Sequence, residues 1–198
     1  RDEAGVPQIW AETAEDLFAA QGYVHAQDRF FEMDYRRHVT AGRLSELVGA
    51  DTDALQADRV VRTLGWRRVA EQEWTLLDAE TRGYLQAYAD GVNAYLRDRS
   101  PSELSVAYTV LGLRVDLERI EPWDPVDSLA WLKAMAWDLR GNYTDELGRA
   151  LAFGAVGDVA RVEQLWPEYP YDRHAPVVPG AGAPAGAPVR PAARVDAE

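Results

Sequence analysis

The feature that most constrains the fold is an apolar stripe in the segment after Asp78. Its apolar residues recur at intervals of three and four, the spacing of one face of an α-helix. Asp78 is a suitable N-cap, and a polar face with Asp90 and Asn93 is expected to be solvated. The segment therefore predicts an amphipathic helix. The stripe consists of Leu85, Tyr88, Ala89, Val92, Tyr95 and Leu96.

A second helix is predicted from a start signal near the N-terminus. Thr13 and Asp16 have the spacing of a capping box, with Asp in place of the usual Glu, and apolar residues then recur to about Val39. Gly22 is a weak point in this helix. Its apolar face is expected to contain Leu17, Ala20, Val24, Phe31 and Tyr35.

Asp28 falls on the same predicted face as Val24 and Phe31, so its carboxylate is expected to be buried and to need a partner. An ion pair or hydrogen bond with Arg29, Arg36 or a backbone amide would satisfy it, which gives the residue a structural role. Gln27, Asp28 and Arg29 are therefore interpreted as scaffold.

The remaining elements make the predicted chain predominantly α, with a short strand at the N-terminus. The segment VPQIWAET indicates the strand, in which Pro7 favours an edge or entry position. Short helices are expected over residues 44–48, ending at Gly49, and over about 54–64. The stretch between Ser100 and Trp123 is irregular and is assigned to no single element.

The last strong helix starts at Asp124-Pro125-Val126-Asp127, which supplies an N-cap, a proline at N1 and an acid at N3. Gly141-Asn142 is expected to break or kink it, and helix resumes over about residues 144–153. Residues 1–175 are thus predicted to form a helical body. Residues 176–198, rich in Gly, Ala and Pro, are predicted to be an extended tail.

Composition excludes several classes of function. A formal net charge of −12 argues against a nucleic-acid partner, because binding to phosphates needs concentrated Lys and Arg. No run approaches the roughly 18–20 apolar residues that a membrane span requires. Arg1 opens directly into charged sequence, so either a signal peptide has been removed or the protein is cytoplasmic. Without cysteine there is neither a disulfide nor a thiolate nucleophile.

No self-contained active site can be found in the sequence. None of the five serines lies in a Gly-x-Ser-x-Gly elbow, and no Gly-rich phosphate loop is present. His25, His38 and His174 are scattered without the spacing of a metal-binding helix, and each is expected to be structural or on the surface. The chain has a helical body, a break near Gly141 and no visible nucleophile.

Four blocks of the sequence, in order, resemble the penicillin acylase family. RDEAGVPQIWA is similar to the family's opening strand, and GYVHAQDRFFEMDYRRHVTAGRLSELVG to its G-Y-x-x-A-Q-D-R helix and the motif that follows. The third and fourth blocks are LQAYADGVNAYL and EPWDPVDSLAWLKAMAWDLRGNYTDEL. Together they extend from Arg1 to about Leu151, which identifies the chain as resembling the family's small α subunit.

The resemblance implies a precursor that cuts itself into a small α and a large β subunit, which form an αββα sandwich as a heterodimer. In such N-terminal nucleophile hydrolases, the first residue of β is a serine whose own α-amino group serves as the base. Oxyanion donors also lie on β. No catalytic residue is therefore expected in this chain, and a periplasmic or secreted location is implied.

The resemblance also implies two roles for the α subunit. Matched without gaps backwards from Glu146, the positions that line the acyl pocket are Ala136, Leu139 and Arg140, with Trp137 and Tyr143 as neighbours. Glu146 matches the single α-chain ligand of a calcium ion shared with β, which suits a hard cation. Core packing for Trp137 and Leu139, an interface ion pair for Arg140 and a favourable helix dipole for Glu146 are the plainer alternatives.

The expected function is hydrolysis of the acyl side-chain amide of penicillin-like substrates. The segment AWDLRGNY differs from that of penicillin G enzymes, so acyl-homoserine lactones and lipopeptides remain alternative substrates. A non-catalytic helical interaction subunit is the alternative from another class, since the aromatic excess and the tail fit it equally.

Overall fold

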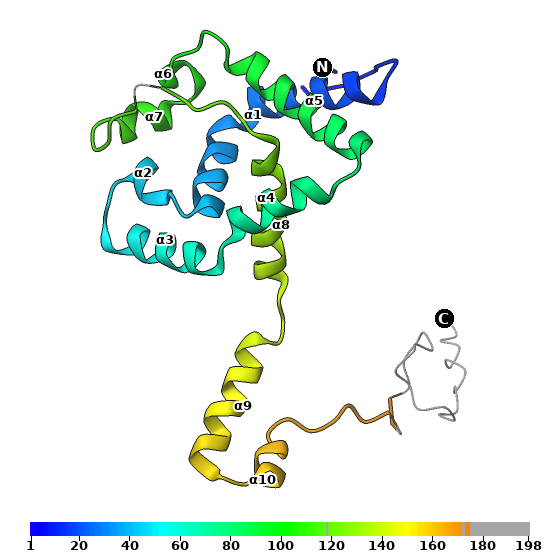
Figure 1. Cartoon of the computed structure of the whole chain (residues 1–198), viewed down its shortest axis with the longest axis vertical. Coiled ribbons are helices and arrows are strands. Elements are labelled where there is room, and N and C mark those ends of the chain that lie inside the picture. Colours follow the sequence, from blue (N-terminus) through cyan, green and yellow to red (C-terminus); the bar gives the residue numbers. More distant parts are fainter. Residues whose placement is uncertain (118, 172, 175–198) are drawn as a thin grey trace, which may run out of the picture. The chain divides into compact units, whose positions relative to one another are not determined.

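The computed structural model describes residues 1–117, 119–171 and 173–174, and these contain ten helices and no strand (Figure 1). The chain divides into two compact units, Arg1–Arg140 and Gly141–Glu198. A predominantly helical fold is thereby confirmed. The first unit contains α1 (Ala14–Ala41), α2 (Leu44–Val48), α3 (Thr52–Leu64), α4 (Trp66–Leu76), α5 (Ala79–Leu96), α6 (Pro101–Leu104), α7 (Val106–Leu111) and α8 (Pro125–Leu139). The second contains α9 (Tyr143–Val156) and α10 (Val159–Glu163).

The predicted helix starts are confirmed by their caps. The Thr13 hydroxyl accepts a hydrogen bond from the backbone of Asp16 at 3.1 Å, and Asp78 caps α5 in the same way. At α8 the capping box is complete, because Asp124 accepts from the helix backbone while the Asp127 carboxylate accepts from the Asp124 N–H at 2.9 Å. These contacts fix where three long helices begin.

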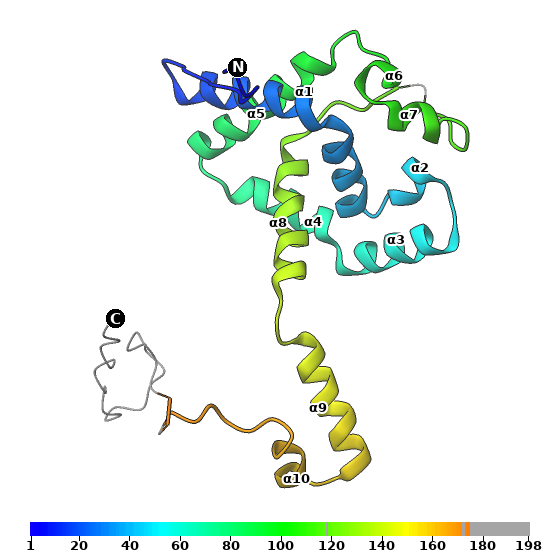
Figure 2. The same cartoon turned by 180° about the vertical axis from the view of Figure 1, so that it is seen from behind.

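Helices α1 and α5 lie against each other through glycine, as the two views in Figures 1 and 2 show. A Cβ atom on Gly22 would come within 2.1 Å of the Tyr88 carbonyl oxygen, and one on Gly91 within 1.8 Å of the Ala19 oxygen. No side chain fits at either position. Gly22 is therefore a contact point between helices, and α1 kinks instead at Arg29, where φ is −144° and ψ is 24°.

The buried face of α1 differs from the one predicted by hydrophobicity. Leu17 and Tyr35 are about two-fifths exposed, whereas Asp34 and Arg37 are buried. The predicted burial of Asp28 is wrong: its side chain is 39% exposed and pairs with Arg1, with 2.5 Å between carboxylate oxygen and guanidinium nitrogen. Small residues mark the inward face because they allow α5 to approach. That face contains Gly22, Ala26, Phe30, Asp34, Arg37 and Thr40.

Two hydrophobic clusters form the core of the first unit. The larger lies between α1, α5 and α7 and includes Phe30, Val92 and Tyr108. The smaller joins α4 to α8 through Ala70, Leu129 and Ala130, with Trp74 and Leu77 packed on it. Helix α4, which was not predicted, thus supplies the support for α8. The larger cluster comprises Ala26, Phe30, Leu47, Ala89, Val92, Tyr108 and Trp123.

Two further expectations need correction. The strand expected over residues 6–13 is not present, because a strand requires a hydrogen-bonded neighbouring strand and the described part of this chain offers none. Trp10 remains 83% exposed. Asn93 is not simply solvated. Its side chain donates to the Trp123 carbonyl at 2.9 Å and accepts from the Trp123 N–H at 2.7 Å, which fixes the loop before α8.

The second unit consists of α9 and α10, which pack together. The Arg149 guanidinium lies 5.6 Å from the centre of the Trp166 ring, and Val162 is buried. The predicted break at Gly141-Asn142 is confirmed, because α8 ends at Leu139 and α9 begins at Tyr143. The predicted tail, 176–198, lies outside the described residues. Among the described helices, none is both long and apolar enough to cross a membrane.

Gly91→Ala should destabilise the protein by about 1–3 kcal/mol, because the added methyl group forces α5 away from α1. Gly83→Ala in the same helix is the matched control, since a Cβ there would meet nothing within 4 Å. That variant should gain about 0.5–1 kcal/mol from helix propensity. Equilibrium denaturation in urea measures both, and equal effects would show that the helices do not touch at Gly91.

Candidate functional site

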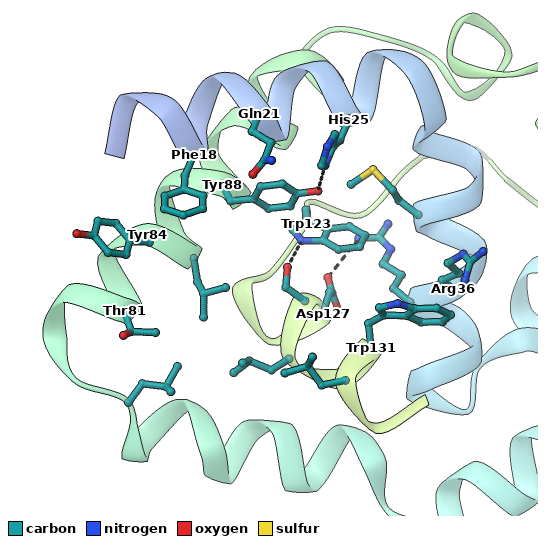
Figure 3. Close-up of a pocket in the computed structure, with 17 residues that line it drawn as sticks. Phe18, Gln21, His25, Arg36, Thr81, Tyr84, Tyr88, Trp123, Asp127 and Trp131 are labelled. Carbon is teal, nitrogen blue, oxygen red and sulfur yellow. Dashed lines mark hydrogen bonds and ion pairs between the residues drawn. The ribbon is translucent and has the colours of Figure 1, made fainter. Parts of the chain in front are cut away.

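An apolar cleft of roughly 810 Å³ lies between α1, α5 and α8 (Figure 3). Aromatic rings line it from all three helices, including Phe18, Tyr84, Tyr88 and Trp131. Sequence reasoning did not find this cleft, because its walls come from segments far apart in the chain and no motif marks them. The apolar periodicity of α1 and α5 was the only sequence signal for these walls, and it indicated that the two helices pack in the core.

The surface of this cleft is mostly apolar, although polar side chains also line it. The Tyr88 hydroxyl and His25 Nδ1 are 3.0 Å apart, and the Trp123 indole N–H donates to the Ser128 hydroxyl at 3.2 Å. Burial raises the pKa of Tyr88 to about 12, so its hydroxyl stays protonated at neutral pH. These groups satisfy each other, and the cleft is suited to an apolar occupant.

A buried charged network adjoins the cleft, and its members Arg37 and Asp127 line it. Arg37 Nε donates to Asp34 at 2.7 Å, and the Tyr108 hydroxyl donates to the other Asp34 oxygen at 2.6 Å. His38 Nδ1 lies 3.2 Å from the same carboxylate. Asp34 is 1% exposed and Arg37 6%, so the charges are removed from water and depend on one another.

The network reaches the start of α8. Arg37 donates to the carbonyl oxygens of Glu121 and Pro122, both at 2.9 Å, and lies 3.8 Å from Asp127. Asp127 is also paired with Arg67 of α4. The loop before α8 is therefore bound to α1 by backbone and side-chain contacts together.

The pKa values in this network follow from burial and pairing. Burial alone would raise the pKa of Asp34, but the His38 hydrogen bond and the Arg37 charge outweigh it and lower the pKa. Burial alone would lower the pKa of His38, but the hydrogen bond and charge of Asp34 raise it overall. The arrangement is therefore an ion-pair network in which Asp34 and His38 each stabilise the charged form of the other.

The serines have structural contacts. Ser45 donates to the Asp58 carboxylate at 2.5 Å, and Ser128 accepts from Trp123. Within the described residues, no serine hydroxyl bonds to a histidine, as a serine–histidine nucleophile would require. The remaining serines lie in or at the start of short helices, at Ser100, Ser102 and Ser105.

The predicted pocket positions in the first unit lie in the last turn of α8 and at its C-cap. Ala136 is exposed and Leu139 is 75% exposed. With Leu132 and Met135 they form an apolar stripe along one side of the helix, at positions i, i+3, i+4 and i+7. The buried Ala130 and Ala134 lie on the opposite side. Leu132 also lines the cleft, so the stripe continues from it.

Trp137 and Arg140 are in contact with each other at the end of α8. The Arg140 guanidinium lies 3.5 Å from the centre of the Trp137 ring, and Arg140 also donates to the Trp137 carbonyl. Trp137 is half-buried against Trp66 of α4, with ring centres 6.1 Å apart. Trp137 therefore has a packing role, whereas the Leu139 side chain lies outside the core of this chain.

The other two predicted site residues lie in the second unit, in the first turn of α9. Tyr143 is 51% exposed, and Glu146 accepts a hydrogen bond from the Asn142 side chain at 2.9 Å. No group of three or more His, Asp or Glu side chains that could hold a metal occurs among the described residues. The Glu146 carboxylate is an oxygen donor of the kind calcium prefers, and further ligands would have to come from outside this part.

Residues 1–189 match the family model described as penicillin amidase. The chain belongs to the penicillin amidase family. A relative is the penicillin acylase 2 proenzyme of Pseudomonas sp., 39% identical over 157 residues, which are 79% of this chain and 19% of that protein. The acyl-homoserine lactone acylase QuiP of Pseudomonas syringae pv. tomato is 34% identical over 174 residues, covering 86% of this chain and 20% of that protein.

A solved structure of the family has the same fold. A chain of the thermostable penicillin G acylase from Alcaligenes faecalis matches with a TM-score of 0.70 and 27% identity, over 92% of this chain and 96% of that one. This chain spans about a fifth of the length of the curated relatives. Since it covers nearly all of the solved chain, that chain has a similar length.

Replacing His38 with Gln should lower stability most at acidic pH. A raised folded-state pKa means that protonated His38 stabilises the fold fully below its ordinary pKa of 6.5. This contribution is lost as pH rises through the folded-state value. The difference in unfolding free energy between wild type and His38→Gln, measured in urea from about pH 5.5 to about pH 9, should therefore shrink as pH rises.

Tyr108→Phe is the control for this experiment. It removes one hydrogen bond to Asp34 but leaves His38 in place. It should cost about 1–3 kcal/mol at every pH, because the buried carboxylate loses a donor. A His38→Gln difference that stays constant across the pH range would contradict the assigned pairing.

Proposed function

We propose that this chain is the α subunit of a heterodimeric amide hydrolase that cleaves acyl side-chain amides, with its nucleophilic serine on a larger β subunit from the same precursor. The observation that carries the proposal is the match in length. The chain corresponds to about a fifth of its full-length relatives, yet to nearly the whole of a separate chain in a penicillin G acylase structure. The absence of a serine–histidine pair among the described residues agrees with it.

The exposed apolar surfaces support a large partner. The α8 stripe and the cleft it adjoins would lie in water if this chain acted alone, and a continuous apolar surface of that kind is typical of an interface. The β subunit would cover most of it. In the first unit, the acyl group of the substrate would contact Ala136, Leu139 and Arg140, with Trp137 beside them. Tyr143 of the second unit is the remaining candidate for a substrate contact.

The missing strand fits the same proposal. Residues 6–13 would pair with a sheet of the β subunit, as one edge of an αββα sandwich, because they lie outside any helix and expose the apolar side chains of Val6 and Trp10. A strand that forms only in the heterodimer would leave no strand pairing among the described residues of this chain alone.

In the proposed mechanism, chemistry and recognition are divided between the subunits. The hydroxyl of the N-terminal serine of β attacks the amide carbonyl, and its own α-amino group, through a water, takes the proton. Donors on β stabilise the oxyanion. The chain described here holds the acyl group in place, so that the carbonyl carbon lies in reach of the serine. A periplasmic or secreted location follows from the same resemblance.

Two substrate classes are supported by the relatives. Penicillin-like amides are one, because the relatives include penicillin acylases. Acyl-homoserine lactones are the other, because several relatives carry that name at 30–34% identity. Lipopeptides share the same apolar acyl chemistry.

Mass spectrometry of the purified protein tests the subunit arrangement. We expect a second, larger chain that begins with serine, because the described residues lack a nucleophile paired with a base. Replacing that serine with alanine should leave an uncut precursor. Recovery of this chain alone, stable and monomeric, would instead indicate the non-catalytic interaction subunit.

A panel of phenylacetyl, phenoxyacetyl, glutaryl, hexanoyl and decanoyl amides then identifies the acyl group. Leu139→Ala and Arg140→Ala test the pocket register in the same assay. Since Leu139 is exposed, its substitution should change acyl preference with little loss of stability. Unchanged preference in both variants would show that the register is displaced.

We also propose that Glu146 is a ligand of a calcium ion shared with β. Glu146→Gln should then lower the calcium affinity of the processed enzyme about tenfold or more, because a carboxylate ligand becomes a neutral amide. Calcium titration after chelator treatment measures this. The matched control is Asp145→Asn, since both acids lie in the first turn of α9. If both variants only lose about 0.3–1 kcal/mol of stability, the helix dipole explains the acids.

A further inference from the structure

The segment that leads into α1 has a strand-like pattern of exposure. Residues 8–12 lie outside any helix, and among the residues that the structure describes their backbone groups form no hydrogen bond with another backbone group. Pro7 and Ile9 are half-buried. This alternation has the period of a β-strand with one open face. The side chains that alternate with them are exposed: Val6, Gln8 and Trp10.

Both ends of this segment are fixed to α1. At one end, Thr13 is the N-cap of the helix and accepts a hydrogen bond from the Asp16 backbone at 3.1 Å. At the other end, one Arg1 nitrogen donates to the Gly5 carbonyl at 2.9 Å, and the other terminal nitrogen donates to the Asp28 carboxylate at 2.5 Å. Gly5 is therefore held beside Asp28, about four turns along α1 from its cap.

The distance between these two anchors leaves the segment little slack. Fifteen residue steps along α1 separate Thr13 from Asp28, which is about 22 Å at about 1.5 Å per residue. Eight residue steps connect Gly5 to Thr13, and a fully extended chain of that length reaches about 26–29 Å. The segment is therefore close to extended. Figures 1 and 2 show it in dark blue, beside the first turns of α1.

Arg1 is the contact that fixes the first of these ends. The nitrogen that donates to Asp28 also donates to the Gln27 side-chain oxygen at 2.7 Å, so two neighbouring residues of α1 hold it. A carboxylate is a stronger acceptor for a guanidinium than a neutral amide is, which makes Asp28 the principal contact. The Asp2 carboxylate accepts from the Val6 N–H at 2.9 Å and closes the turn between Arg1 and the segment.

The open side of the segment is suited to pairing with the edge of a β-sheet. Extended backbone with unpaired N–H and C=O groups is what an added strand offers to a sheet. Val6 is 50% exposed and Trp10 83%, so such pairing would also cover apolar side chains. Since this chain spans about a fifth of the length of relatives in its family, the remainder of such a protein is large enough to supply the sheet.

We infer that Asp28, together with Gln27, is a positioning residue for subunit assembly: by holding Arg1, it keeps residues 6–13 extended and presents them as a preformed edge to a sheet of the β subunit. The inference rests on the proposed function and assigns to these two residues of α1 the ordering of the strand. A segment that is ordered before docking loses less conformational entropy on binding. Part of the affinity between the subunits therefore comes from contacts within this chain.

Hydrogen–deuterium exchange of the processed heterodimer tests this role, read by mass spectrometry on peptides that cover residues 8–12. In the wild type these amides should exchange slowly, because they pair with the sheet. Asp28→Ala should speed their exchange by about three- to tenfold, since a charge-assisted hydrogen bond at a partly exposed site is lost. Asp28→Glu keeps the carboxylate and should restore exchange to within about twofold. If Asp28→Ala gives no processed heterodimer, Arg1→Ala removes the other side of the same pair and replaces it.

Glu32→Ala is the matched control. Glu32 also forms an exposed ion pair on α1, with 2.5 Å between its carboxylate and Arg36, but both partners of that pair lie in the same helix. Exchange of residues 8–12 should not change in this variant. Equal increases in Asp28→Ala and Glu32→Ala, or an Asp28→Ala heterodimer that exchanges at the wild-type rate, would overturn the inference.

Failure of the proposed function would give a different result. A wild-type preparation without a second chain would overturn the proposed function, and the role of Asp28 with it. Fast exchange of residues 8–12 in a wild-type heterodimer that hydrolyses acyl amides would overturn only the inference, because the subunits would then assemble without pairing this segment.

Discussion

The arrangement of the first unit depends on the buried ion pair between Asp34 and Arg37. Two charges removed from water are tolerated only when their remaining hydrogen-bonding groups are satisfied, and here each has partners from other elements. Tyr108 brings α7 to Asp34, while the carbonyl oxygens of Glu121 and Pro122 bring the loop before α8 to Arg37. Any displacement of these elements would leave a buried charge unpaired, so the pair selects one packing.

The consequence is a fixed starting point for α8. Once the loop is bound to Arg37, the Asp124 cap sets the first turn, and Arg67 holds Asp127 from α4. The helix then has one side against Ala70 and the other, apolar, in the open. A long apolar stripe left in the open, beside a core that also buries charges, is unusual for an independent domain. That arrangement is consistent with a component that folds around part of a larger protein.

Sequence patterns predicted where the helices begin and end more accurately than they predicted which residues of those helices are in contact. Caps at Thr13, Asp78 and Asp124 are local signals, and all three were found. The buried face of α1 was misplaced because hydrophobicity favours large residues, whereas two helices in close contact bury glycine and alanine. The N-terminal strand needed a partner that the described chain lacks, and the cleft unites three distant helices. Such non-local features cannot be deduced from spacing.

The two ends of α8 differ in burial: its start is packed in the core, whereas Ala136 and Leu139 near its end are exposed. Val126, Leu129 and Ala130 are buried in a core whose alteration would cost about 2–5 kcal/mol for a large-to-small change. Ala136 and Leu139 are exposed, so their substitution costs the fold little. Under the proposed function, a substitution at Ala136 or Leu139 can change the acyl group that is accepted while the buried start of α8 keeps its packing.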